Sequence, residues 1–156
     1  MTRFRPLQVL VVEDNPDDVE IARRGFARSK VACDLLVLRD GQEVLDALFA
    51  PPSSGQGPAP RPDFILLDIK LPKVDGLEVL KRLRDSEELS VIPVVMLTSS
   101  GRDEDVNTSY RLGVNSYIQK PVTFDRFLEA LEVLGQYWFQ VATLPRVPWR
   151  GMRADG

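Results

Sequence analysis

Polar residues with different chemistry stand at the ends of apolar runs in this sequence. Glu13 and Asp14 follow the first run, Asp68 follows a later one, and Thr98 and Lys120 follow two more. The carboxyl ends of parallel strands lie along one edge of a sheet, and open α/β sheets bind ligands beyond that edge. Each residue alone could be an ordinary polar residue at a strand exit. The five together indicate one site with three carboxylates, one hydroxyl and one ammonium.

These carboxylates need positive charge nearby. Two carboxylates about 4 Å apart repel each other by about 4 kcal/mol at an effective dielectric constant of about 20. Lys120 supplies one positive charge, and magnesium fits the remainder, because it binds through one or two carboxylates and coordinates phosphate oxygens. Asp68 beside such an ion, a lysine and a hydroxyl is a plausible nucleophile for a phosphoryl group. The metal, Lys120 and Thr98 would then bind the three phosphoryl oxygens.

Composition excludes several other kinds of site and partner. The chain has no histidine and one cysteine, which excludes Ser-His-Asp and Cys-His sites, a phosphohistidine and an internal disulfide, and argues against zinc. Its 20 basic and 23 acidic residues give a net charge of −3. The chain therefore lacks the excess of positive charge that is typical of proteins that bind nucleic acid or an anionic membrane. No apolar run is long enough to span a bilayer, and the N-terminus lacks a signal-peptide pattern. We therefore expect a cytoplasmic protein without a nucleic-acid or membrane partner.

The elements that must position these residues alternate along the chain. Five apolar runs, one of them the continuous FILL at 64–67, are each followed by an amphipathic helical pattern. This alternation predicts an α/β protein with a parallel sheet and right-handed crossovers. Strands are expected at residues 7–12, 33–38, 64–67, 92–97 and 116–119; helices are expected after Asn15, Asp40, Asp75 and Thr123, and from about 103 to 112, before Gly113.

Two stretches have no apolar periodicity. Residues 51–62 (PPSSGQGPAPRP) are expected to form a flexible surface loop that is too short to separate domains. Residues 141–156 are expected to form a C-terminal tail that is too short for a second domain. The sequence therefore predicts one domain over residues 1–140 and no separate output domain.

Four motifs occur in a fixed order: VLVVEDN at 9–15, ILLDIKLPKVDG at 65–76, VVMLTSS at 94–100 and YIQKP at 117–121. With this set the chain resembles the receiver domain of a two-component response regulator over residues 7–139. The resemblance implies a flavodoxin-like (βα)5 doubly wound sheet with strand order 2-1-3-4-5. The EDNPDD start, the proline-rich loop and the long last helix resemble a narrower group, the single-domain regulators paired with phytochrome-type histidine kinases. That likeness implies a sensor histidine kinase, here a bacterial phytochrome, as partner and a role in light signalling.

The resemblance also implies roles around the metal. Asp68 would accept phosphate from a kinase histidine. Glu13 and Asp14 would hold Mg²⁺, Glu13 through water, with Asp68 and the backbone carbonyl of Lys70 as further ligands. Lys120 would contact the phosphate; the alternative is a solvated lysine.

Further roles are implied beside the phosphate. Thr98 would close on the phosphoryl group, and Tyr117 would turn inward in step with it, although Tyr117 could also be an ordinary half-buried strand aromatic. The Lys120-Pro121 peptide would be cis. Ser99 would either flank the phosphate or cap the fourth helix.

The readout is expected on the face made by the fourth helix, the fifth strand and the fifth helix. That face and the apolar residues Leu134, Tyr137, Trp138 and Phe139 suggest a homodimer; alternatively these residues cover the end of the core. The protein is expected to be a phosphoacceptor rather than an enzyme. A metal-dependent phosphohydrolase is an alternative, but it would need a general acid two residues after Asp68, where Lys70 stands. A receiver that binds partners without phosphorylation is a third reading.

Overall fold

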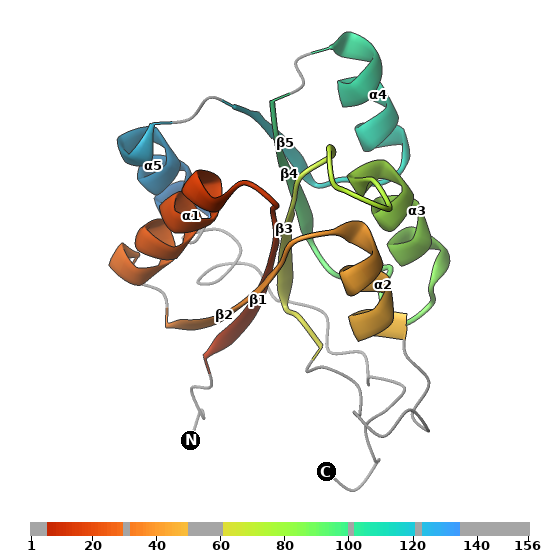
Figure 1. The fold of residues 1–156 in the computed structure, drawn as a ribbon, viewed down its shortest axis with the longest axis horizontal. Coiled ribbons are helices and arrows are strands. Elements are labelled where there is room, and N and C mark those ends of the chain that lie inside the picture. Colours follow the sequence, from red (N-terminus) through yellow and green to blue (C-terminus); the bar gives the residue numbers. More distant parts are fainter. Residues whose placement is uncertain (1–5, 30–31, 50–60, 100–101, 121–122, 135–156) are drawn as a thin grey trace, which may run out of the picture.

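A computed structural model describes residues 6–29, 32–49, 61–99, 102–120 and 123–134, and the account below concerns these residues. Five strands form one parallel sheet in the order β2-β1-β3-β4-β5, with helices between them (Figure 1). The strands are β1 (Leu7–Val12), β2 (Cys33–Leu38), β3 (Phe64–Leu67), β4 (Val94–Thr98) and β5 (Ser116–Gln119). The helices are α1 (Pro16–Arg28), α2 (Gly41–Phe49), α3 (Gly76–Asp85), α4 (Asp103–Arg111) and α5 (Phe124–Leu134). The predicted flavodoxin-like α/β fold and its strand order are confirmed.

The core lies on both faces of the sheet, because alternate residues of each buried strand point in opposite directions. On one face Val9, Val11 and Phe64 pack with residues of α1 and α5. On the other face Leu10 and Ile65 pack with residues of α2 and α3. Figure 1 shows the same division, with α1 and α5 on one side of the sheet and α2, α3 and α4 on the other. The continuous apolar runs thus fill two cores at once.

Most helices start at the residues whose side chains predicted a start. Asn15 Oδ1 accepts the N–H groups of Asp17 and Asp18, and Pro16 opens α1. Asp75 Oδ1 accepts the N–H of Glu78 at 2.9 Å, and Thr123 Oγ1 accepts that of Arg126 at 3.2 Å. These local hydrogen bonds satisfy donors that have no partner within the helix.

The fourth strand begins later than predicted. The expected range 92–97 is wrong at both ends, since β4 runs from Val94 to Thr98. Ile92 belongs to the preceding turn, where its N–H donates to the carbonyl of Leu89. Pro93 has no N–H to give to the sheet, although its carbonyl accepts the N–H of Ile65.

Candidate functional site

The strand ends are aligned by backbone hydrogen bonds that continue one residue beyond the strands. The N–H of Asp68 donates to the carbonyl of Val12 at 3.1 Å, which sets Asp68 beside the end of β1. The N–H of Lys120 donates to the carbonyl of Thr98 at 2.7 Å, which sets Lys120 beside the end of β4. The sheet therefore brings the residues that follow β1, β3 and β5 to one edge, as the sequence predicted.

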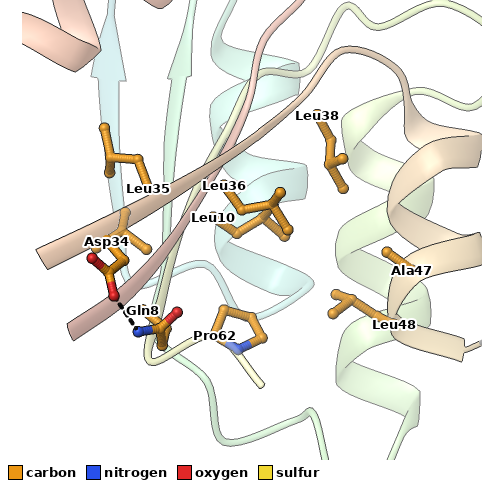
Figure 2. Close-up of a pocket in the computed structure, with 10 residues that line it drawn as sticks. Gln8, Leu10, Asp34, Leu35, Leu36, Leu38, Ala47, Leu48 and Pro62 are labelled. Atoms are coloured by element: carbon orange, nitrogen blue, oxygen red, sulfur yellow. Dashed lines mark hydrogen bonds between the residues drawn. The ribbon is translucent and has the colours of Figure 1, made fainter. Parts of the chain in front are cut away.

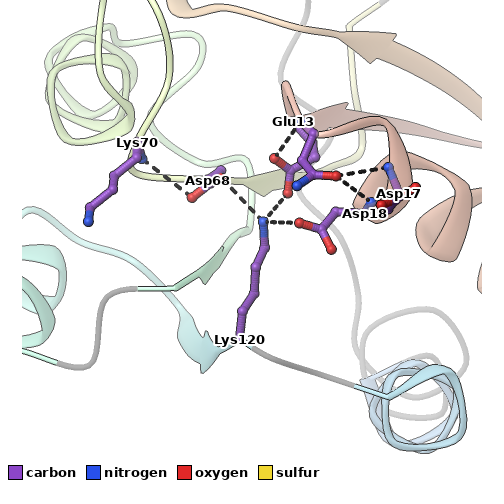
Figure 3. Close-up of polar contacts among 7 residues, drawn as sticks. Glu13, Asp17, Asp18, Asp68, Lys70 and Lys120 are labelled. Atoms are coloured by element: carbon purple, nitrogen blue, oxygen red, sulfur yellow. Dashed lines mark hydrogen bonds and ion pairs between the residues drawn. The ribbon is translucent and has the colours of Figure 1, made fainter.

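The Lys120 ammonium lies at the centre of this edge. Its Nζ donates to Oε1 of Glu13, to Asp18 Oδ2 at 2.8 Å and to Asp68 Oδ2 at 3.3 Å (Figure 3). The Lys120 side chain is 12% exposed, and the side chains of Glu13 and Asp68 are 5% and 8% exposed. Lys120 is therefore a largely enclosed partner of carboxylates, and the solvated-lysine alternative does not hold.

Asp18 is a site residue that sequence reasoning missed. Its position in the first turn of α1, where a carboxylate interacts favourably with the helix dipole, indicates by itself only a role in stabilising the helix. Its contact with Lys120 joins residues 102 positions apart, so no local pattern could have revealed it.

The burial of opposite charges shifts two pKa values. Burial raises the pKa of Glu13 to about 7, against the opposing hydrogen bond from Lys120, and the charge of Asp68 adds to the rise. Burial by itself would lower the pKa of Lys120, but its hydrogen bonds to Asp18 and Glu13 and the charge of Asp68 raise it overall. One ammonium thus faces an excess of carboxylates, a cluster that favours a further cation.

Glu13, Asp14 and Asp68 each offer a carboxylate oxygen, and these three oxygens lie within 4.8 Å of one another. Glu13 and Asp68 are buried, whereas Asp14 is exposed and open to solvent. Hard divalent cations prefer such oxygen donors. The donor set therefore fits Mg²⁺ or a similar ion.

The loop after β3 is held in place by two glycines. A β-carbon on Gly76 would lie 2.0 Å from the carbonyl oxygen of Asp68, and one on Gly41 would lie 1.9 Å from that of Val74. Within this loop the N–H of Lys70 donates to Asp68 Oδ1 at 3.4 Å, and Lys73 has a φ of 68°. The close approaches of α2 and α3 thus fix the backbone that follows Asp68.

The remaining predicted site residues lie around the cluster. Thr98 is buried at the end of β4. Tyr117 pairs with Met96 in the sheet and is half-buried against the core on the α3 side. Ser99 is exposed, and its alternative role as the cap of α4 is wrong, because Arg102 stands at the cap position.

A larger cavity lies away from this cluster. It has a volume of about 210 Å³ and is lined mainly by apolar residues of β1, β2 and α2 (Figure 2). Among the described residues that line it, the one ionisable residue is Asp34, which accepts a hydrogen bond from Gln8 at 3.0 Å. The reactive side chains are therefore gathered at the carboxyl ends of the strands and not in this cavity.

Several expectations fall outside the described residues. They are residues 51–60 of the flexible loop expected over 51–62, the cis peptide at Pro121, the apolar residues 137–139 and the tail over 141–156. Within the described ranges, no helix combines the length and the apolar character needed to cross a membrane.

Comparison with known proteins agrees with this architecture. Residues 9–132 match the response regulator receiver domain family. The chain is 40% identical over 133 residues to a probable methanogenesis regulatory protein, FilR2, of Methanothrix harundinacea, covering 85% of this chain and 84% of that protein. It is 35% identical over 140 residues to the response regulator Rcp1 of Synechocystis, covering 90% of this chain and 94% of Rcp1.

Solved structures with the same fold include phytochrome response regulators. The phosphorylated cyanobacterial phytochrome response regulator RcpA has a TM-score of 0.81 at 35% identity, covering 91% of this chain and all of RcpA. The Mn²⁺-bound form of Rcp1 has a TM-score of 0.80 at 35% identity, covering 90% of this chain and 100% of that one. The bacteriophytochrome response regulator RtBRR has a TM-score of 0.71 at 44% identity, covering 92% and 85%.

Proposed function

The chain belongs to the response regulator receiver domain family, and on that premise we propose that it is a phosphorylation switch with Asp68 as phosphoacceptor. The observation that carries the proposal is the meeting of Glu13, Asp68 and Lys120 at the carboxyl edge of the sheet. In the transfer step a carboxylate oxygen of Asp68 forms a bond to the phosphorus of a kinase phosphohistidine. The P–N bond breaks, and the imidazole leaves with the electron pair.

Glu13, Asp14, Asp68 and the backbone carbonyl of Lys70 are the proposed holders of Mg²⁺. When bound, the ion would neutralise carboxylate charge and coordinate phosphoryl oxygens, which favours transfer. The three-carboxylate cluster supports this assignment, as does the Mn²⁺-bound form of Rcp1, a relative.

The residues around Asp68 are proposed to bind the oxygens of the phosphoryl group. Lys120 already donates to Asp68 Oδ2, so its ammonium is placed to neutralise the negative charge of a phosphoryl group bound there. Thr98 stands at the end of the neighbouring strand, from which its hydroxyl would bind another phosphoryl oxygen, with Ser99 flanking it. These donors act as positioning and electrostatic groups around the acyl phosphate.

The switch would run from Thr98 to Tyr117. Thr98 closes on the phosphoryl group, and Tyr117, three positions before Lys120 on β5, turns further into the core. The two side chains would thus carry a local change of charge to the face formed by α4, β5 and α5.

Family membership implies a histidine kinase partner. RcpA and RtBRR are phytochrome response regulators, which supports a bacterial phytochrome as the kinase and light as the input. FilR2 is named for methanogenesis regulation. The competing hypothesis is therefore a kinase that responds to a signal other than light.

A homodimer through α4, β5 and α5 is the proposed readout. Tyr110 on α4 is 51% exposed and Val133 on α5 is 67% exposed, more than a helix face committed to the core requires. Solution scattering with and without beryllofluoride, a phosphoryl mimic, tests this. A monomer under both conditions would rule the dimer out.

Turnover of phosphate monoesters has little support. The Lys70 side chain is exposed and extends away from the cluster in Figure 3. It offers no general acid at the position where a phosphohydrolase would need one.

Phosphotransfer tests the function directly. Radiolabelled kinases, including a bacterial phytochrome and one of another input class, are mixed with the wild type and with Asp68→Asn. We expect label on the wild type alone and fastest transfer from the phytochrome. Equal labelling of Asp68→Asn would disprove the assignment of Asp68, and failure of every kinase to label the wild type would favour the phosphorylation-independent reading.

A further inference from the structure

Asp18 holds Lys120 from a different direction than the other carboxylates. Asp18 lies in the first turn of α1, whereas Glu13 and Asp68 follow strands of the sheet. Figure 3 shows the Lys120 ammonium between them, with Asp18 on the side of α1. The N–O distance to Asp18 is 2.8 Å, against 3.3 Å to Asp68. The ammonium therefore lies nearer to Asp18 than to Asp68, while it also donates to Glu13.

Asp18 is itself fixed in position. The Asn15 side chain caps α1 and accepts the N–H groups of both Asp17 and Asp18 at 2.9 and 3.3 Å. The Asp18 side chain is 27% exposed, and it lines the same small cavity as Glu13 and Asp68. A carboxylate on a capped first turn is a rigid support for a lysine that must keep its position.

Asp18 also stands apart from the proposed metal ligands. A lysine ammonium has three donors, and Glu13, Asp18 and Asp68 each accept one. The carboxylates that could share a metal ion are Glu13, Asp14 and Asp68. Asp18 is therefore the partner of Lys120 that a metal ion and a phosphoryl group would leave in place.

We propose that Asp18 is a positioning residue that holds the Lys120 ammonium on the α1 side of the site, so that Asp68 remains available to a divalent ion and a phosphoryl group. The proposal rests on the proposed function and deepens it. Without the Asp18 carboxylate, the partners of the ammonium among the described residues are Glu13 and Asp68. The ammonium then competes with the metal ion for both.

Asp17 provides a matched control. It lies next to Asp18 in the same first turn, is exposed, and loses the same charge near the helix N-terminus when changed to Asn. Asp18→Asn and Asp17→Asn are compared by isothermal titration with Mg²⁺, each with Lys120 present and in a Lys120→Met background. We expect Asp18→Asn to bind Mg²⁺ about tenfold more weakly than Asp17→Asn, the size of one lost hydrogen bond between charged groups.

The Lys120→Met background separates positioning from charge. The difference between the two Asn variants should disappear there, because the ammonium that Asp18 positions is gone. Equal affinities with Lys120 present, or a difference that persists without Lys120, would overturn the proposal.

A second readout needs neither metal nor phosphate. In ¹⁵N-lysine-labelled protein in EDTA, the Lys120 ammonium should give an exchange-protected NMR signal in the wild type and in Asp17→Asn, and lose it in Asp18→Asn. Retention of the signal in Asp18→Asn would refute the positioning role. If the wild type took up no phosphate while this pattern held, the proposed function would fail but the positioning of Lys120 by Asp18 would stand.

Discussion

A β-carbon on Gly76 would lie 2.0 Å from the carbonyl oxygen of Asp68. Helix α3 thus begins against the backbone of the proposed phosphoacceptor, and the N–H of Gly76 donates to the carbonyl of Ile69 at 2.6 Å. The position of Asp68 therefore depends on the absence of a side chain at residue 76.

Gly76→Ala should displace the peptide of Asp68. Because backbone cannot yield as a flexible side chain does, we expect a loss of about 1–3 kcal/mol or more in the free energy of unfolding, together with slower phosphorylation. Urea unfolding and acetyl phosphate labelling measure the two effects. Glu78→Ala, on the exposed side of the same turn, is the control; a Gly76→Ala protein as stable and as active as this control would contradict the account.

Local signals explain which parts of the fold were predictable. The caps at Asn15, Asp75 and Thr123 act within three residues, so the sequence predicted them correctly. The start of β4 was predicted wrongly because apolar character extends to Ile92, while hydrogen bonding places that residue in a turn.

The site was predictable where it depends on strand ends and not where it depends on packing. Glu13, Asp68 and Lys120 follow strands, and the parallel sheet brings them together. Asp18 reaches Lys120 from the first turn of α1, across 102 positions of the chain, and a side chain at Gly41 would collide with the carbonyl oxygen of Val74. Neither contact could be predicted from the residues that are adjacent in the sequence.

Arg84 should be the main support of the turns at the far end of β4. Its guanidinium donates to the carbonyls of Gly113, Ser90 and Ile92 at 2.8–2.9 Å and to Asn115 Oδ1 at 3.1 Å. Arg84→Met would remove these four hydrogen bonds, although Asn115 Oδ1 would keep the N–H of Val94, and we expect a loss of about 2 kcal/mol in the free energy of unfolding.

Arg82→Met is the matched control for Arg84. Arg82 lies on the same helix, with its guanidinium 5.6 Å from the centre of the Phe49 ring, a contact worth about 0.5–1 kcal/mol at an exposed site. Chemical denaturation of both variants compares them. Equal losses would show that the Arg84 hydrogen bonds add nothing beyond side-chain packing.

Magnesium should stabilise the wild type through the exposed carboxylate of Asp14. An ion that binds only the folded protein adds about 2.7 kcal/mol at one hundred times its Kd, seen as a higher Tm. Asp14→Asn should keep the wild-type Tm in EDTA, because Asp14 is exposed, and lose most of the increase with Mg²⁺. An undiminished increase in Asp14→Asn would exclude Asp14 from the metal site, and Asp17→Asn controls for the lost charge.

The central claim is that Asp68 accepts phosphate within the cluster of Glu13, Asp14 and Lys120. The most direct measurement is labelling by radioactive acetyl phosphate, with and without Mg²⁺, followed by mass-spectrometric mapping of the modified peptide. We predict Mg²⁺-dependent label on the peptide that contains Asp68, and none on Asp68→Asn. Label on another residue, or equal labelling of Asp68→Asn, would contradict the claim.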